Sequence, residues 1–270
     1  MHILKGYTKQ EISWMMYDWA NSAHSVIIVT LLPIFFDTVA GYTADSVSSM
    51  STWGYATSIA MLIVALAAPF LGVFGDIRGM RKKLFSFFML LGVAACAGMA
   101  FTPGMDFTSG PVAAGKVASL ILVLYIVSVI GFDASAIYYD AFLTDVTIED
   151  RMDKVSTMGY GLGYIGGSTI PLLIFLIMNL VGVPMLTCLA FVFGLTAVWW
   201  LAFSLPLLKN CEQTSGKPYE KGDVARSIKG VGTTIKEIIA NKPMLIYILS
   251  YFFYIDGVHT VISMATTYGT

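Results

Sequence analysis

The amino-acid sequence predicts an all-α, polytopic membrane protein, built as a bundle of six membrane-spanning helices followed by a seventh helix. Three observations lead to this fold class. Hydrophobic residues make up 57% of the sequence and charged residues only 12%, whereas soluble domains carry about 25% charged residues. The mean hydropathy is +0.75. The apolar residues form long segments, and the basic residues are concentrated in every second connection between these segments.

Seven segments are long and apolar enough to cross a bilayer as a helix, which takes about 20 residues. In chain order they are 12–36, 53–75, 84–101, 117–143, 158–182, 184–208 and 243–265. The first segment is longer than the apolar region of a cleavable signal peptide. We therefore expect it to remain in the protein as a spanning helix.

The basic residues predict how the segments are oriented. Lys5 and Lys9 precede the first segment, and the connections after the second, fourth and sixth segments are basic. Together these regions hold 15 of the 16 Lys and Arg residues, and the exception is Lys116 before the fourth segment. Because basic connections stay on the cytoplasmic side, we expect a cytoplasmic N-terminus. If the segments were core helices of a soluble protein, this sorting would have to arise by chance.

Several functional classes find no support in the sequence. The net charge of −1 provides no bulk attraction to nucleic acid. Cys96, Cys188 and Cys211 are scattered and show no metal-ligand spacing, so we expect no disulfide framework, no metal site and no bound cofactor. The Gly-x-Gly-x-x-Gly pattern at 161–166 lacks the preceding strand and the acidic partner of a dinucleotide site.

The connection after the sixth segment divides the sequence into three predicted parts. These are a six-helix bundle at 1–208, a cytoplasmic linker at 209–242, and the first helix of an incomplete second bundle at 243–270. Within the linker, residues 223–241 predict an amphipathic helix along the inner membrane surface, because apolar residues recur every three or four positions: Val224, Ile228, Val231, Ile235 and Ile238. We expect either that the sequence is incomplete relative to its parent molecule or that two copies complete each other.

All the charges inside the predicted spans are acidic. They are Asp18 in the first span, Asp133 and Asp140 in the fourth, and Asp256 in the seventh. A charge at the centre of a bilayer costs about 2.5–3.5 kcal/mol on insertion scales. These four carboxylates therefore need either a polar environment or a function.

Helical spacing groups the acids with other polar residues. Asp18, Asn21, Ser22 and Ser25 share one face of the first span, since they lie at positions i, i+3, i+4 and i+7. Such a polar stripe implies an aqueous cavity or a polar partner. The seventh span repeats the spacing with Asp256, His259, Thr260 and Ser263.

A structural role and a functional role are both open for several of these residues. Asp18 and Asp140 lie within about two turns of the inner end of their spans, where they could reach interfacial water or a cation in a loop. Asp133 and Asp256 lie near mid-span, where neither interfacial water nor a loop cation is within reach, so their position favours function. His24 and His259 could each be a hydrogen-bonding core residue or a proton carrier.

Small residues in the fifth span predict close helix packing. Gly159, Gly163 and Gly167 are spaced four apart, which forms a ridge that lets a neighbouring helix approach. Pro171, in the same span, predicts a kink. The tryptophans at Trp53, Trp199 and Trp200 are most simply interpreted as interface anchors or as lipid-facing bulk.

The motif "GVFGDIRGMRKK" at 72–83 resembles the signature loop between helices two and three of the major facilitator superfamily. The matching residues are Gly72, Asp76, Gly79, Arg81 and Lys82, whereas Ile77 and Met80 depart from the pattern. The resemblance implies that the matching residues form a conformational latch, which holds the inner ends of the two halves of the transporter together in one state. The basic residues could also simply orient the spans.

Three further motifs resemble one branch of this superfamily, the autophagy-related vacuolar amino-acid effluxers and their bacterial relatives. They are "YDWANSA", "YYDAFLTDVTIEDRMDKVSTMGYGLGYIGG" and "YFFYIDGVHT". The resemblance covers the whole chain but only the first seven of the family's twelve helices. It implies that helices one, four and seven line the transport cavity, and the buried acids lie on those same three spans.

We therefore expect a secondary transporter that moves a small solute, such as an amino acid or a peptide, across a prokaryotic cell membrane by alternating access. The expected binding residues for the solute, or for a coupling proton or cation, are Asp18, Asn21, Ser25, Asp133, Asp140, Asp256, His259 and Thr260. The alternatives are an integral-membrane enzyme and a nontransporting membrane scaffold. The enzyme finds little support, because no HExxH or GxSG-like element is present.

Overall fold

A computed structural model describes residues 4–43, 49–216, 218 and 223–269, and for residues 223–228, 234, 259 and 262–269 it describes the backbone alone. Every regular element within these ranges is a helix. Within these ranges six helical rods are long and apolar enough to cross a membrane, or seven if the bent pair at 229–240 and 242–258 counts as one span. The predicted all-α, multi-pass fold is therefore confirmed.

Five of the six rods are single helices: α1 (Lys9–Ala40), α2 (Ser49–Gly75), α3 (Arg81–Met99), α4 (Pro111–Val146) and α7 (Met185–Asn210). The remaining rod, fifth in chain order, consists of α5 (Glu149–Leu162), a π-helical turn η3 (Gly163–Ser168) and α6 (Thr169–Leu180). A short 3₁₀ turn, η2 (Thr102–Gly104), follows α3. Each rod overlaps one of the first six predicted spans, with ends that differ from the prediction by up to nine residues.

The helix α1 begins at a capping box. The Glu11 amide donates to the Thr8 hydroxyl at 3.1 Å, and the Thr8 amide donates to the Glu11 carboxylate at 2.7 Å. Arg151, from the first turn of α5, donates to both Glu11 oxygens at 2.8 and 2.9 Å. This pair joins α1 to α5 at the end of the bundle that carries most of the basic residues, which we call the basic end.

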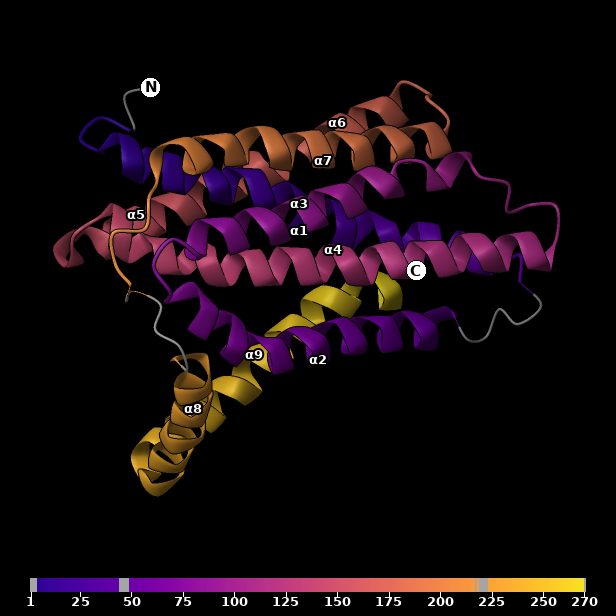
Figure 1. The fold of residues 1–270 in the computed structure, drawn as a ribbon. Helices are drawn as coiled ribbons and strands as arrows, with labels where there is room; N and C mark the ends of the chain where they lie inside the picture. The colour runs from indigo at the N-terminus through magenta and orange to yellow at the C-terminus, as the bar shows by residue number, and fades with distance from the viewer. Residues whose placement is uncertain (1–3, 44–48, 217, 219–222, 270) are drawn as a thin grey trace.

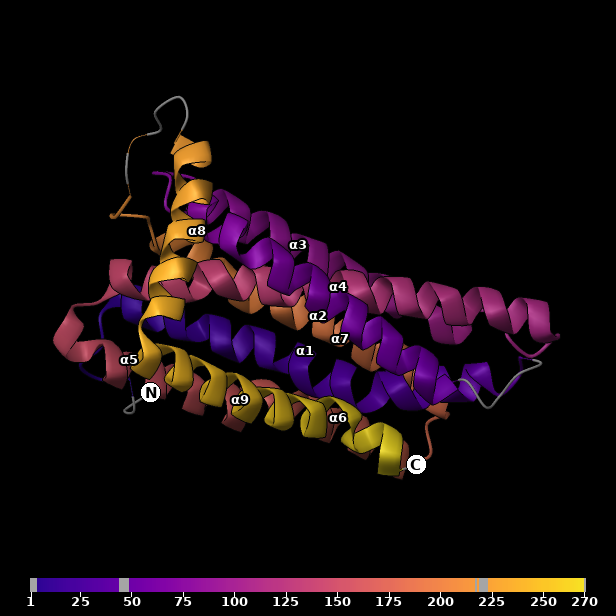
Figure 2. The ribbon, with the colours of Figure 1, turned by 90° about the horizontal axis from the view of Figure 1, so that it is seen from below.

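The helix α1 lies at the centre of the bundle (Figures 1 and 2), where it packs against α4, α7 and the fifth rod. Large side chains fill the interior, among them Tyr17, Phe35, Phe85 and Trp200. The expectation that Trp53 and Trp200 face lipid or the interface is wrong, because they are 2% and 0% exposed. Gly92 of α3 makes room for one of them: a Cβ atom at Gly92 would lie 2.4 Å from the Trp200 ring.

The irregular turn in the fifth rod lies just before the proline. Pro171 lacks the N–H that would bond to a carbonyl one turn back, and the chain widens into η3 at 163–168. The Thr169 hydroxyl donates to the Tyr164 carbonyl at 2.9 Å, which satisfies one of the carbonyls in the widened turn. The glycines at 163, 166 and 167 leave room for α1 at this turn. The distortion expected at Pro171 therefore takes the form of a π-helical turn that ends three residues before the proline.

Two further helices follow the bundle, α8 (Asp223–Ala240) and α9 (Lys242–Gly269). The helix predicted at 223–241 is present as α8. At Asn241 the chain turns by 101° from 229–240 into 242–258. The Asn241 side chain accepts the Met244 amide at 3.2 Å and so caps α9. In Figures 1 and 2, α8 runs crosswise to the bundle at the basic end, while α9 packs along α1.

Candidate functional site

The polar stripe of α1 lies against the glycine ridge of the fifth rod. A Cβ atom at Gly159 would lie 2.6 Å from Asp18 Oδ2, and one at Gly163 would lie 2.6 Å from Ser22 Oγ. A Cβ atom at Gly167 would lie 2.4 Å from the Trp19 carbonyl oxygen. Two patterns that are separate in the sequence therefore meet in space, and the glycines bring the α5 and η3 backbone up to the acid of α1.

The carboxylate of Asp18 has a partner on α4. The Tyr139 hydroxyl donates to Asp18 Oδ2 at 2.8 Å. The Tyr139 ring stacks on Trp14 with centroids 4.3 Å apart, and the Trp14 indole N–H donates to the Tyr139 carbonyl at 2.9 Å. One turn away, the hydroxyl groups of Tyr17 and Ser135 lie 2.8 Å apart. Aromatic packing and hydrogen bonds thus fix the position of Asp18 relative to α4.

A second acid lies close to Asp18. Asp140, the residue after Tyr139 on α4, is exposed, and its charge repels that of Asp18. Tyr160 on α5 lies within electrostatic range of both acids and of Tyr251 on α9. We call Asp18, Asp140, Tyr160 and Tyr251 the paired-acid site. Its members come from four helices, α1, α4, α5 and α9, and no Lys or Arg lies within any of the predicted spans.

The other predicted binding residues lie outside this group. Asp133 is half-buried seven residues before Asp140, or about 10 Å along the helix axis, and its charge interacts with Tyr125. Asn21 is buried and Ser25 half-buried on α1, whereas Asp256 and Thr260 are exposed on α9. The side chain of His259 lies outside the described residues. Asp256 forms no ion pair in the described part of the chain.

The histidine on α1 is a core residue. His24 is buried, its Nε2 lies 3.2 Å from the Ser128 hydroxyl, and its ring stacks on Phe132. Within the residues that the structure describes, no cluster of three or more His, Cys, Asp or Glu side chains could hold a metal ion.

The latch loop, residues 72–83, joins α2 to α3 at the basic end. Arg81 is buried and pairs with Asp145 at the end of α4, and it also donates to the Ala141 carbonyl at 3.0 Å. Asp76, the acid identified from the motif, is 83% exposed and lies 3.8 Å from Arg81. Gly79 has a φ of +79°, which glycine adopts most readily. The buried ion pair of the loop is therefore made with Asp145, which the motif does not contain.

The remaining motif residues lie at the surface of the loop. Gly72 has open space where a Cβ atom would be, and Lys82 is half-buried. Lys82 makes no ion pair in the described part of the chain.

The segment after α7 is bound to the latch loop. The Gln213 side chain accepts the Gly79 amide at 2.8 Å and donates to the Gly75 carbonyl at 3.0 Å. The amides and hydroxyls of Thr214 and Ser215 donate to Asp145 Oδ1 at 2.8 to 3.0 Å. The start of the linker therefore closes the latch loop against the end of α4.

Sequence reasoning assigned no role to Asp145, Tyr139, Tyr160 or Gln213. Asp145, Tyr139 and Tyr160 lie inside a motif that carried the family resemblance, so the signal was present without a role attached. For Gln213 no signal was available, because its partners lie more than 130 positions away in the sequence.

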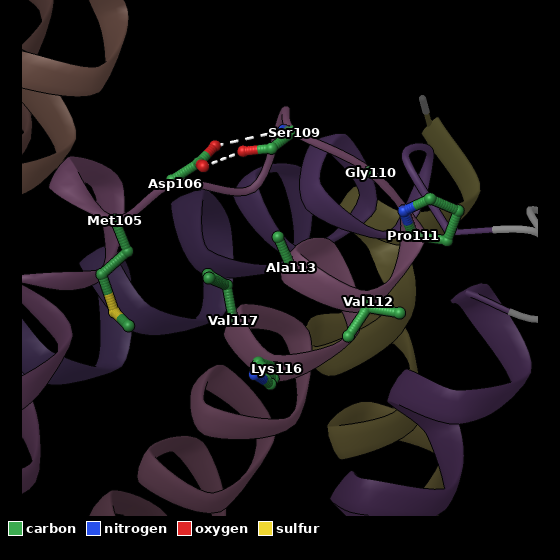
Figure 3. A pocket seen from close by; sticks show the side chains of 9 residues that line it. All are labelled: Met105, Asp106, Ser109, Gly110, Pro111, Val112, Ala113, Lys116 and Val117. Carbon is green, nitrogen blue, oxygen red and sulfur yellow. Dashed lines mark hydrogen bonds between the residues drawn. The ribbon is translucent and has the colours of Figure 1, made fainter.

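A separate pocket of about 470 Å³ lies at the opposite end of the bundle, before and within the first turns of α4 (Figure 3). Asp106 accepts hydrogen bonds from the Ser109 amide and hydroxyl and so closes the loop that forms one wall. Lys116 lies at the other side of this pocket. None of the predicted binding residues lines it.

Comparisons with known proteins find similarity over most of the chain. The profile of the family described as "Vacuole effluxer Atg22 like" matches residues 42–148 and 144–270. A protein of Bacillus subtilis, named MFS-type transporter YxiO, is 40% identical over 276 residues, which cover 99% of this chain and 62% of YxiO.

Two fungal proteins named Autophagy-related protein 22-1 are similar over shorter stretches. The one from Penicillium rubens is 26% identical over 136 residues, which cover 46% of this chain and 23% of the relative. The one from Sclerotinia sclerotiorum is 27% identical over 128 residues, which cover 42% and 21%. The chain thus spans less than two thirds of the length of each of these relatives.

Proposed function

The chain belongs to the Atg22-like vacuole effluxer family, and we propose that it forms the first bundle of a secondary transporter that moves a small solute across a membrane. The names of its relatives, a transporter and autophagy-related proteins, support transport over catalysis. The proposal also covers the identity of the solute, the coupling ion and the transport mechanism.

The paired-acid site is the observation that carries the proposal. Asp18 and Asp140 lie near enough for their negative charges to repel each other when both are ionised. Like charges at one site are stable only with a counter-charge, a bound proton or water. No Lys or Arg is present in the predicted spans, so a counter-charge has to come from outside these spans.

A solute with an amino group satisfies this site best. An ammonium group can lie between two carboxylates, and the faces of Tyr160 and Tyr251 can add cation–π attraction. Amino acids and small peptides have this group. A proton that neutralises one carboxylate is the alternative coupling species. Asp133 on α4 and Asp256 on α9 are additional candidates for binding.

Alternating access requires the first bundle and a second bundle to rock about the site. We propose that the paired-acid site lies at the boundary between them, with Tyr160 in the first bundle and Tyr251 on α9 as the first helix of the second. The latch loop lies at the basic end, where opening would have to occur. We propose that Gly72, Asp76, Gly79, Arg81 and Lys82 act there as the latch, with Asp145 as the buried partner of Arg81.

The distribution of basic residues supports a cytoplasmic basic end and N-terminus. The similarity to YxiO of Bacillus subtilis supports a prokaryotic cell membrane as the location. In this orientation the linker at 209–242 lies on the cytoplasmic side.

The test is a flux measurement on the full-length protein in proteoliposomes, with radiolabelled amino acids and dipeptides as substrates and an imposed proton gradient. We expect Asp18→Asn and Asp140→Asn to reduce uptake at least about tenfold, the loss expected when a charge-assisted contact of about 1.5–3 kcal/mol is removed. Asp106→Asn, at the opposite end of the bundle, is the matched control and should transport normally. Normal uptake by both site variants would remove the paired-acid site from the mechanism.

A further inference from the structure

The helix α8 has an apolar arc that the described part of the chain covers only in part. Successive residues are separated by about 100° around a helix, so Val231, Ile235, Ile238 and Ile239 fall within an arc of about 100°. Val231 and Ile238 are half-buried, whereas Ile235 and Ile239 are 51% and 59% exposed. The exposed part of the arc is therefore available for contact with lipid or another apolar surface.

Two lysines lie beside this arc. Lys229 and Lys236 are exposed and fall about 60–80° beyond the edge of the arc at Ile239. Neither forms an ion pair within the described ranges. Glu237 lies on the side of the helix away from the arc, about 80–100° from the two lysines, so the lysines are nearer to the arc than the acid is.

The orientation of α8 matches the plane of a membrane. The helix α9 is apolar enough to complete a spanning rod, and α8 meets it at 101°. If α9 crosses the bilayer, α8 runs nearly parallel to the surface at the basic end, as Figure 2 shows relative to the bundle. Asn241 caps α9 directly after α8 ends, so the corner fixes α8 at the depth where α9 begins.

The latch loop adds charge at the same end. Arg78 and Lys83 are exposed, and neither of them makes an ion pair with the residues that the structure describes. The helix α8 packs against α2, the helix that leads into this loop. These two cations extend the positive surface beyond α8, and the exposed Asp76 of the same loop offsets one of them.

From this arrangement we propose that α8 binds the anionic lipid headgroups of the leaflet at the basic end. The isoleucines enter the interface, and Lys229 and Lys236 extend to the headgroup phosphates. An acidic soluble protein would be attracted by the lysines but would not account for the isoleucines beside them. This proposal concerns lipid and does not depend on which solute the chain transports.

The test places an environment-sensitive fluorophore on α8 of the reconstituted chain, at Ile235→Cys or, as a matched control on the far side, at Glu237→Cys. The three native cysteines are buried, which limits background labelling. Quenching by brominated lipid is measured in vesicles of phosphatidylcholine alone and of phosphatidylcholine mixed with phosphatidylglycerol. We expect strong quenching at Ile235→Cys in the mixed vesicles and weak quenching at Glu237→Cys.

Charge is tested with Lys229→Gln and Lys236→Gln, and with Lys116→Gln at the opposite end of the bundle as the control. Each α8 variant should lower the ratio of docked to detached helix about fivefold, the change that follows from about 1 kcal/mol per lysine at an anionic surface. Raising the salt from about 0.1 to about 1 M should have the same effect, because the Debye length falls from about 10 to about 3 Å. Equal quenching at the two probe positions would overturn the proposal. The proposal would also be overturned if neither phosphatidylglycerol nor the two lysine substitutions changed the quenching. That result would indicate that the lysines bind a protein partner instead of lipid.

Discussion

At the scale of single residues, a missing side chain decides how closely α5 approaches α1. The Asp18 carboxylate occupies the space that a Cβ atom at Gly159 would need, and its other neighbour is the Tyr139 hydroxyl. Glycine at this position therefore brings the α5 backbone up to the acid. Two residues further along α5, Gly161 has no neighbour within 4 Å of its Cβ position.

We expect Gly159→Ala to destabilise the bundle by about 1–3 kcal/mol, the usual effect of overpacking a close contact. Gly161→Ala is the matched control on the same helix, and it should leave stability unchanged or raise it slightly. Thermal unfolding in detergent, followed by the reactivity of the three buried cysteines, measures both variants. Equal stability of the two variants would show that α5 does not approach α1 at Gly159.

The two acids around Arg81 are also predicted to differ. Asp145 is a buried partner and Asp76 an exposed one, and breaking a buried pair costs about 3–5 kcal/mol while an exposed pair contributes about 0–1 kcal/mol. Asp145→Asn should therefore lower the unfolding temperature strongly and Asp76→Asn hardly at all. The same thiol-reactivity experiment measures both, and the reverse order would contradict the placement of Arg81.

The sequence predicted which residues are chemically unusual better than it predicted their partners. Asp18, the glycine ridge and Arg81 were each recognised from spacing or a motif. Their contacts could not be, because the Tyr139 hydroxyl and Asp145 are paired with them by the packing of α4 against α1 and α3. The prediction for Trp53 and Trp200 was wrong for a related reason. An apolar residue in a spanning helix can face lipid or the core, and hydropathy does not distinguish the two.

At the scale of helices and loops, the segment after α7 holds the latch loop closed. Gln213 bonds to the loop at both Gly75 and Gly79, so the loop conformation depends on a residue that follows the sixth rod. Losing these bonds should cost about 0.5–1.5 kcal/mol each.

We expect Gln213→Ala to open the loop and to speed trypsin cleavage after Arg78 about tenfold, as the loss of two such bonds implies. The neighbouring exposed residue provides the control, Glu212→Ala, which should be cleaved at the rate of the unmodified chain. Mass spectrometry of the N-terminal fragment reports the rate. Identical rates for both variants would show that Gln213 does not restrain the loop.

The helices were predicted well because hydropathy and length determine which segments can cross a bilayer. Their ends were predicted less well, since polar turns such as 144–146 of α4 and 149–157 of α5 extend the helices beyond the apolar segments. The π-helical turn at 163–168 could not be predicted from hydropathy and segment length either. It depends on Pro171 and on the close approach of α1, and the second of these is a tertiary effect.

At the scale of the whole molecule, the helices predicted to carry the transport site do meet, although only some of the predicted residues come together. The helix α1 packs against both α4 and α9, and Asp18 and Asp140 lie within electrostatic range of each other. Asp133 and Asp256 were expected from their depth in the membrane, and their joint role remains a prediction. Depth along a helix can be read from sequence, whereas rotation of a helix toward its neighbours depends on packing.

The central claim is that the paired-acid site is reached by water and cations, and reaction of Asp140→Cys with a cationic, membrane-impermeant thiosulfonate tests it most directly. The lipid-facing control is Ile177→Cys on α6, where the native side chain is 57% exposed and no acid is nearby in the sequence. We predict that Asp140→Cys in the reconstituted protein reacts at least about tenfold faster than this control, since thiolates form in water and not in hydrocarbon. A rate at Asp140→Cys as slow as at Ile177→Cys would contradict the account.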